Sequence, residues 1–217
     1  MHNDVLDTLT DYPFDRLRAL LGDSTPPDGC APIHMQIGEP KHPPPDFIAP
    51  ILTQDMSGWG KYPPPNGPDD LRAAIAAWLT TRYDLSPGTI DPAQHIAIVS
   101  GTREALFMAA LLAVPREKNG ARPAVLMPNP FYHVYGTAAL ASGAESLYLS
   151  ATKETGHLPD LDGLNEDTLA RMAVMFLCSP ANPQGVVADA TYLERAIKLA
   201  RKHDFLLAVD ECYAEIY

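Results

Sequence analysis

The stretch Asp204-Phe205-Leu206-Leu207-Ala208-Val209-Asp210-Glu211-Cys212-Tyr213-Ala214-Glu215-Ile216 decides the fold class. Its apolar run, 205–209, is short and branched enough to predict a strand buried on both faces. A carboxylate, Asp210, follows directly, and a phenol, Tyr213, comes three residues later. Because ligands of open α/β sheets bind beyond the carboxyl ends of the strands, the acid and the phenol could contact the same ligand. The simpler alternative is that Asp210 caps a turn and Tyr213 packs in the core.

Strand-like and helix-like segments alternate through most of the chain that precedes this stretch. Branched apolar runs predict strands, whereas apolar residues spaced by three and four predict helices. The predicted strands are 96–99, 124–127, 146–149 and 174–178, and the predicted helices are 103–114, 134–141 and 190–203. The inner face of the last helix is predicted to carry Leu193, Ile197 and Ala200. The alternation predicts an α/β fold with a largely parallel sheet, flanking helices and right-handed crossovers.

The N-terminal part of the chain has a different character. The sequence predicts a short helix over 13–21 and a brief strand over 33–40, each followed by loop residues. A later helix is predicted to be N-capped by Asp69 or Asp70. Its predicted inner face carries Leu71, Ile75, Trp78 and Leu79. Residues 1–50 are too few to bury a core of their own, so we expect an arm there rather than a domain.

The composition restricts the class of protein. The chain has 217 residues, a hydrophobic content of 46% and a formal net charge of -11. The apolar content supports a folded core, and the negative charge disfavours nucleic acids and anionic membranes as partners. Three cysteines without CxxC spacing, Cys30, Cys178 and Cys212, predict reduced thiols rather than disulfides or a zinc site. The sequence shows no signal-peptide pattern and no run of membrane-spanning length, so we expect a soluble cytoplasmic protein.

Three other predicted strand ends carry residues suited to a ligand. Gly101 lies between a strand and a helix start, where the backbone of Gly101, Thr102 and Arg103 could cradle an anion. Tyr132 could cover a flat heterocycle, and the amide of Asn182 could donate to a phenolate-like oxygen. Two of these features have a simpler alternative, because a Ser-Gly-Thr turn also caps ordinary helices and a lone tyrosine commonly packs in a core.

The strand ends together supply an anion cradle, an aromatic ring, an amide, a phenol and a carboxylate. This set suits pyridoxal phosphate, whose phosphate would meet the helix N-terminus and whose ring would meet Tyr132. The 3-oxygen would meet Asn182 and Tyr213, and the pyridine nitrogen would meet Asp210. The carboxylate would keep that nitrogen protonated, which makes the ring an electron sink. Pro183, next to Asn182, is a candidate for a cis peptide bond.

Six sequence blocks resemble the fold-type I (class I/II) pyridoxal-phosphate aminotransferases, and the chain is especially similar to the succinyldiaminopimelate aminotransferases of bacterial lysine biosynthesis. The blocks follow the family's order: Tyr12-Pro13-Phe14 with Leu17-Arg18; Ile37-Gly38-Glu39-Pro40-Lys41-His42-Pro43; Gly101-Thr102-Arg103-Glu104-Ala105-Leu106-Phe107; Pro128-Asn129-Pro130-Phe131-Tyr132; Ser179-Pro180-Ala181-Asn182-Pro183; and Asp210-Glu211-Cys212-Tyr213-Ala214-Glu215-Ile216-Tyr217. The resemblance implies an incomplete transferase-like large domain. Residues 1–50 would be the N-terminal arm and small-domain segment, and residues 51–217 the N-terminal part of the cofactor-binding large domain.

The resemblance also implies a role for individual residues. The implied cofactor-binding residues are Gly101, Thr102, Arg103, Tyr132, Asn182, Asp210, Tyr213 and Tyr62. Gly38 would line the site of the substrate carboxylate. Tyr62 would reach the cofactor phosphate of a neighbouring subunit, because the family builds its active site at a homodimer interface. The implied substrates are amino acids and 2-oxo acids. Gln184 departs from the threonine that many relatives carry, at a turn position that should tolerate it.

No catalytic residue is expected within these 217 residues. The family's reaction needs a lysine that forms a Schiff base with the cofactor, in a Ser-x-x-Lys motif downstream of the block that here is Asp210 to Tyr213. All six lysines precede that block: Lys41, Lys61, Lys118, Lys153, Lys198 and Lys202. We therefore expect the N-terminal part of an aminotransferase, inactive and poorly soluble by itself. The alternatives are another amino-acid aminotransferase or carbon–sulfur lyase on the same scaffold, or a non-catalytic sensor module, whose basic DNA-binding N-terminus the acidic start here disfavours.

Overall fold

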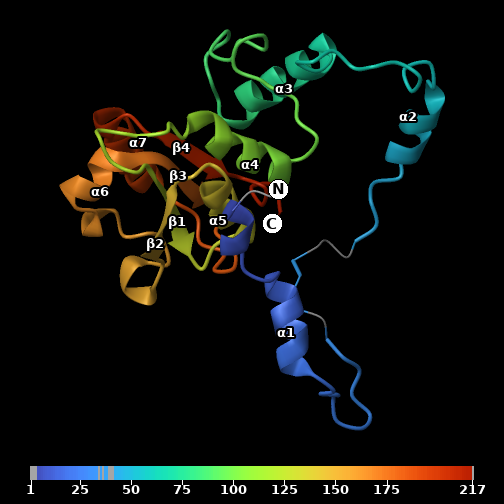
Figure 1. Cartoon of the computed structure of the whole chain (residues 1–217). Coiled ribbons are helices and arrows are strands. Elements are labelled where there is room, and N and C mark those ends of the chain that lie inside the picture. The colour runs from blue at the N-terminus through green and yellow to red at the C-terminus, as the bar shows by residue number, and fades with distance from the viewer. Residues whose placement is uncertain (1–3, 34, 36, 39–41, 217) are drawn as a thin grey trace. The chain divides into compact units, whose positions relative to one another are not determined.

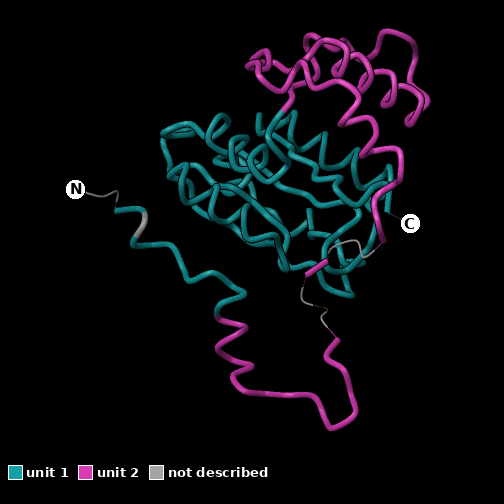
Figure 2. The backbone as a smooth tube through the Cα atoms, turned by 90° about the vertical axis from the view of Figure 1, so that its right-hand side faces the viewer, with its two compact units in different colours: residues 1–15, 99–217 teal, residues 16–98 magenta. Residues whose placement is uncertain are grey.

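The computed structural model describes residues 4–33, 35, 37–38 and 42–216. The chain divides into two compact units, which Figure 2 distinguishes by colour. Unit 1 comprises residues 1–15 and 99–217, and unit 2 comprises residues 16–98. All the predicted cofactor-binding residues except Tyr62 belong to unit 1.

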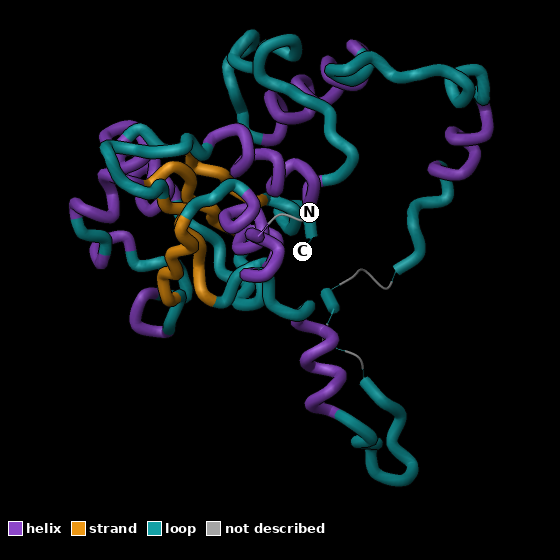
Figure 3. Tube along the Cα trace, viewed as in Figure 1, coloured by secondary structure: helices purple, strands orange, loops and turns teal. Residues whose placement is uncertain are grey.

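Unit 1 is built on four parallel strands in the order β2-β1-β3-β4 (Figures 1 and 3). The strands are β1 (Ala124–Asn129), β2 (Glu145–Ser150), β3 (Met172–Cys178) and β4 (Leu206–Asp210). The helices of this unit are α4 (Thr102–Ala113), α5 (His133–Ala141), α6 (Glu166–Arg171) and α7 (Ala190–His203), with the short 3-10 turns η1 (Asp4–Thr8), η2 (Lys153–Thr155) and η3 (Leu161–Gly163). The predicted α/β fold with a parallel sheet is confirmed.

Helices cover both faces of the sheet. Alternate side chains of a strand point to opposite faces, so β1 sends Val125 and Met127 toward α4 and α5, and Leu126 toward α6 and α7. In β3 the same alternation separates Phe176 from Met175. Every residue of β3 is buried, as is typical of a central parallel strand.

Helix α7 is fixed at both ends. At its start the carboxylate of Asp189 accepts a backbone N–H from the first turn at 2.7 Å, which satisfies one of the unpaired donors there. At its end Asp204 adopts a left-handed conformation with φ of +52°. The ammonium group of Lys118 donates to the carbonyl oxygens of Met172 (2.6 Å), His203 (2.9 Å) and Asp204. These bonds tie the end of α7, and with it the start of β4, to the start of β3.

Strand β4 lies at the edge of the sheet. It pairs with β3, and no other strand of the described residues pairs with it. Leu206 is therefore 41% exposed, and the prediction of a strand buried on both faces was wrong. The apolar run has the composition of a central strand, but an edge strand lacks the neighbour that would cover it. The residues predicted for the inner face of α7, Leu193, Ile197 and Ala200, do lie toward β4. Beside the open edge Ile197 nevertheless stays 40% exposed, and Ala196 is the buried residue of the helix.

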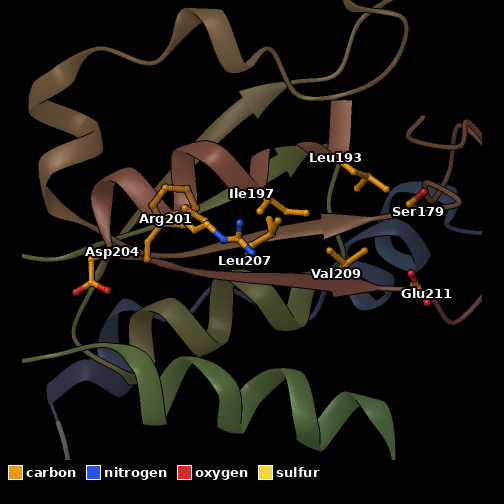
Figure 4. Close-up of a pocket in the computed structure, with 10 residues that line it drawn as sticks. Ser179, Leu193, Ile197, Arg201, Asp204, Leu207, Val209 and Glu211 are labelled. Carbon is orange, nitrogen blue, oxygen red and sulfur yellow. The ribbon is translucent and has the colours of Figure 1, made fainter. Parts of the chain in front are cut away.

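A cavity of about 540 Å³ lies between this edge and α7. Figure 4 shows Leu193 and Ile197 of α7 facing Leu207 and Val209 of β4, with Asp204 at one end of the cavity and Ser179 and Glu211 at the other. The lining is mostly apolar. We call this cavity the β4 groove.

Three predictions on local structure outside the sheet were wrong. Residues 96–99 are irregular rather than a strand, since they pair with no strand of the described residues. In the segment predicted as a strand over 33–40, Ile33 and Met35 are irregular, Ile37 lies in a bend, and residues 34, 36 and 39–40 lie outside the described residues. Asp69 and Asp70 lie inside the first turn of a helix whose N-cap is Pro68.

Unit 2 contains α2 (Ile48–Gln54), α3 (Asp69–Arg82) and most of α1 (Pro13–Leu21), whose bounds are as predicted. The predicted inner face of α3 is largely open, since Leu71 is 43% and Trp78 49% exposed, although Ala76 is buried. The described part of unit 2 places no apolar layer over these side chains. None of the helices in the described ranges is long and apolar enough to cross a membrane.

Candidate functional site

The carboxyl ends of β1, β3 and β4 lie along one edge of the sheet, because the three strands are parallel neighbours. The chain continues from these ends into Tyr132, Asn182 and Tyr213, respectively. Asp210 is itself the last residue of β4. The topology therefore gathers the predicted ring, amide, phenol and carboxylate at one end of unit 1.

Asp210 is the buried charged residue of this group, with 8% of its surface exposed. One carboxylate oxygen, Oδ2, accepts a hydrogen bond from the phenol of Tyr135 at 2.7 Å. The other, Oδ1, accepts the backbone N–H of Cys212 at 3.2 Å. The backbone carbonyl of Asp210 accepts the N–H of Ser179 at 3.0 Å, which joins the ends of β3 and β4. Asp210 thus caps the turn that follows β4 and at the same time presents a fixed carboxylate.

Tyr135 was not predicted as a site residue from the sequence. It lies in the first turn of α5, is 1% exposed, and stacks on Phe176 of β3 with ring centroids 4.5 Å apart and planes 6° apart. Burial, followed by the hydrogen bond to Asp210, raises its pKa far above the ordinary value for tyrosine. The phenol therefore stays protonated and donates. The spacing Tyr132-x-x-Tyr135, one helical turn, is the signal that could have identified it.

Asn182 and Tyr213, predicted to act together, are in direct contact. The amide nitrogen of Asn182 donates to the phenol oxygen of Tyr213 at 3.1 Å, which leaves the O–H of Tyr213 available as a donor. Burial raises the pKa of Tyr213, so this phenol is also protonated. The peptide bond between Asn182 and Pro183 is cis, which confirms that prediction.

Tyr132 links the helix start of α4 to this cluster. Its phenol oxygen accepts a hydrogen bond from Nε of Arg103 at 3.1 Å. Its ring meets Tyr135 edge-on, with centroids 5.8 Å apart, and meets His133 at 4.8 Å. The bond to Tyr132 raises the pKa of Arg103, while burial and then the charge of Arg103 lower the pKa of His133. The site thus keeps a cation at Arg103 beside a neutral imidazole.

The N-terminus of α4 has the features of an anion site. Gly101 precedes the helix with φ of +124° and ψ of +153°, a conformation essentially restricted to glycine, and no side chain caps this end of α4. Its first backbone N–H groups are thus left without a capping side chain. A Cβ atom added to Gly101 would lie 2.9 Å from Oε2 of Glu104. A close approach by a ligand to this backbone requires glycine here.

Two predicted site residues, Gly38 and Tyr62, belong to unit 2. Both are exposed, and the side chain of Tyr62 makes no close contact that shields it, with an exposure of 101%. Their predicted roles at the substrate carboxylate and in a neighbouring subunit stay predictions.

The described side chains fit pyridoxal phosphate on chemical grounds. An uncapped helix N-terminus beside Arg103 suits a phosphate, and the paired Asn182 and Tyr213 suit an aromatic oxygen. A buried carboxylate that already receives two hydrogen bonds suits a cationic ring nitrogen. Among the described lysines of unit 1, Lys118 bonds to carbonyls at the opposite ends of the strands, and Lys153, Lys198 and Lys202 are exposed.

Known proteins match this chain along nearly its whole length. Residues 32–217 match the family model described as aminotransferase class I and II. The LL-diaminopimelate aminotransferase of Syntrophobacter fumaroxidans is 30% identical over 214 residues, which cover 97% of this chain and 53% of that protein. The protein of the same name from Moorella thermoacetica is 29% identical over 96% of this chain and 52% of its own length. The chain spans about half the length of the curated relatives it matches.

Solved structures of aminotransferases are also similar to this chain. An aminotransferase from Neisseria meningitidis Z2491 is similar with a TM-score of 0.91 and 38% identity, over 100% of this chain and 54% of that chain. The aminotransferase AspB from Helicobacter pylori 26695 is similar with a TM-score of 0.83 and 35% identity, over 96% of this chain and 53% of that chain.

Proposed function

Because the chain belongs to the aminotransferase class I and II family, we propose that its strand ends hold pyridoxal phosphate in a protein that moves amino groups between amino acids and 2-oxo acids. The observation that carries the proposal is the buried Asp210 carboxylate, held by the phenol of Tyr135 and the N–H of Cys212. When bound, pyridoxal phosphate supplies an electron sink for the chemistry at the amino carbon.

In this proposal, each residue of the site binds a different part of the cofactor. Asp210 binds the pyridine nitrogen and keeps its proton there, because an anion beside a cationic group favours the charged form. Asn182 and Tyr213 orient the ring through its 3-oxygen, as their mutual hydrogen bond supports. The backbone of Gly101, Thr102 and Arg103 receives the phosphate. Tyr132 covers the ring.

The reaction requires a lysine that bonds to the cofactor and, once released, moves the proton at the amino carbon, and the described lysines of unit 1 lie elsewhere. We propose that these 217 residues bind the cofactor without that covalent bond and do not transaminate by themselves. Borohydride treatment of the chain with pyridoxal phosphate, followed by peptide mapping, tests this. Stoichiometric labelling of a single lysine, abolished by Asp210→Asn, would contradict it.

The proposed substrate is a diaminopimelate-type amino acid of lysine biosynthesis. The sequence blocks resemble enzymes for N-succinyl-LL-2,6-diaminopimelate with 2-oxoglutarate, whereas the curated relatives described above are named for LL-diaminopimelate. We propose the succinylated donor, with LL-diaminopimelate as the second candidate.

The proposed assembly is a homodimer with an active site at its interface. The full exposure of Tyr62 supports a role for that residue in the neighbouring subunit's site. Gly38 is proposed to line the substrate carboxylate site. The proposed division of the chain keeps residues 1–50 as arm and small-domain segment and residues 51–217 as part of the large domain.

Calorimetry with pyridoxamine 5′-phosphate tests the cofactor site, because this amine form of the cofactor binds without a covalent bond to lysine. We expect the chain to bind it, and Asp210→Asn to weaken binding by at least about tenfold, since a neutral amide cannot replace the anion. Asp167→Asn, an exposed aspartate of α6, is the matched control and should leave binding unchanged. Equal affinities of all three proteins would contradict the proposed site.

A chimera tests the substrate. This chain would replace the matching 54% of the Neisseria meningitidis aminotransferase, whose remaining part would complete the fold. We expect transamination of 2-oxoglutarate with N-succinyl-LL-2,6-diaminopimelate to exceed that with LL-diaminopimelate. The opposite order would overturn the succinylated donor in favour of the second candidate.

A further inference from the structure

We propose that Tyr135 is a positioning residue, whose hydrogen bond holds the Asp210 carboxylate oriented toward the ring nitrogen of the cofactor. The proposal rests on the proposed function, because it assigns Asp210 to that nitrogen. Tyr135 itself would touch neither the cofactor nor the reacting atoms.

The hydrogen bonds of Asp210 give the first argument. Each carboxylate oxygen has one fixed protein donor, the phenol of Tyr135 on Oδ2 at 2.7 Å and the N–H of Cys212 on Oδ1 at 3.2 Å. Two donors on different oxygens fix the rotation of the carboxylate. An ionised carboxylate can accept about four hydrogen bonds, so acceptor capacity remains for a ligand.

The packing of Tyr135 gives the second argument. Its ring lies flat on Phe176, and its edge-on neighbour is Tyr132. Tyr135 is on α5 and Phe176 is on β3, so the phenol is held by two layers of the fold. With 1% exposure, the ring has little freedom, and its hydroxyl remains directed at Asp210.

The titratable neighbours of Asp210 give the third argument. The titratable groups on which the charge of Asp210 acts are Tyr135 on α5, Cys178 on β3, and Cys212 and Tyr213 beyond β4. Burial, reinforced by the charge of Asp210, raises the pKa of each, so all four are neutral near pH 7. Helix α4, which packs on β4, carries Arg103 and Glu104 in its exposed first turn. The negative charge in this buried group therefore resides on Asp210, and the phenol is its side-chain donor.

Loss of the phenol hydroxyl has a predictable effect. A carboxylate that loses one of its two fixed donors can rotate away from the ring nitrogen of the ligand. An anion that no longer faces this nitrogen favours its charged form less. That nitrogen should then lose its proton at a lower pH.

The test is a pH titration of the chain bound to pyridoxamine 5′-phosphate that carries ¹⁵N at the ring nitrogen, followed by NMR. We expect Tyr135→Phe to lower the midpoint of ring-nitrogen deprotonation by about one pH unit or more. Tyr192→Phe is the matched control. It removes a half-buried phenol packed on the opposite face of the sheet, whose hydroxyl donates to the carbonyl of Pro159 at 2.8 Å, and should leave the midpoint unchanged.

Each outcome decides a different question. An unchanged midpoint in Tyr135→Phe, with a lowered midpoint in Asp210→Asn, overturns the role of Tyr135 and leaves the proposed function intact. An unchanged midpoint in Asp210→Asn, or no binding by the wild-type chain, overturns the proposed function and this inference with it. If Tyr135→Phe does not fold, Phe176→Leu replaces it, because it keeps the hydroxyl but removes the stacked ring. A smaller shift in the same direction supports the proposal, and no shift contradicts it.

Discussion

Cys178 and Asp210 are directly opposite each other in the parallel register of β3 and β4. Cys212 follows two residues later, and its N–H reaches the same carboxylate at 3.2 Å. Two thiols therefore lie around one negative charge. Burial and then, for Cys212, the charge of Asp210 raise both thiol pKa values, that of Cys212 to about 12.

We predict that Cys212 is slow to alkylate although it is exposed. With a pKa of about 12, only about one thiol in ten thousand is ionised at pH 8, and the thiolate is the reactive form. Iodoacetamide labelling followed by mass spectrometry should show Cys30, exposed in unit 2, reacting at least about a hundredfold faster. Asp210→Asn removes one cause of the shift and should speed up labelling of Cys212. Equal rates for Cys30 and Cys212 in the wild-type chain would contradict the assignment.

Gly101→Ala should impair both stability and phosphate binding. The backbone conformation of Gly101 is essentially closed to other residues, so we expect a loss of about 1–3 kcal/mol in the free energy of unfolding. The new methyl group would also press on Glu104 at the anion site. Urea denaturation and calorimetry with pyridoxamine 5′-phosphate measure the two effects.

Gly143→Ala is the control for this variant. Gly143 also has a positive φ, +82°, but lies between α5 and β2 with open space around its Cβ position. It should lose about 1 kcal/mol of stability and keep its affinity. A Gly101→Ala chain that binds as well as Gly143→Ala would argue against a phosphate at the start of α4.

Lys118→Met should destabilise unit 1. The substitution leaves the carbonyls of Met172, His203 and Asp204 without their charged donor, at a cost of about 2 kcal/mol. Urea denaturation should show a lower midpoint with an unchanged slope. Lys153→Met, at an exposed position in η2, should change the midpoint little. Similar losses in the two variants would mean that the charge of Lys118, and not its three bonds, matters.

The β4 groove should promote self-association of the chain. Ile197 is 40% exposed beside the open edge of the sheet, and such edges pair with other chains. Ile197→Lys places a charge in the groove, and light scattering should show less association. Thr191→Lys adds the same charge on the exposed face of α7 that carries Glu194 and Lys198, and should have no such effect. Equal solubility of both variants and the parent would locate the association elsewhere.

Much of the fold was predictable because the central helices and strands carry the apolar pattern and the end residues that their structure needs within their own sequence. The bounds of α7 match the predicted 190–203, since its apolar period, its cap at Asp189 and its basic last turn agree. β3 is longer than predicted but buried throughout. Residues 96–99 and the two faces of β4 were mispredicted for one reason. A strand, and the burial of a strand, depend on neighbours that the local sequence does not contain.

The site residues could be predicted where a polar or ionisable side chain lies at or just beyond the end of a predicted strand. Asn182 and Tyr213 are in contact, and Asp210 ends its strand as expected. Tyr135 escaped notice because a tyrosine in an alanine-rich helix has the pattern of an ordinary core residue. Its hydroxyl has a role at the site only through its hydrogen bond to Asp210, which lies 75 positions away in the sequence.

The three carbonyl bonds of Lys118 also bear on folding kinetics. Its partners are 54, 85 and 86 positions away, so the ammonium group can reach them only after both crossovers to β3 and β4 have closed. Closing such long loops costs conformational entropy before the contacts form, so we expect these bonds to form late in folding. Lys118 would then mainly lower the unfolding rate of unit 1. The lifetime of the folded unit would therefore depend on one side chain far from the cofactor site.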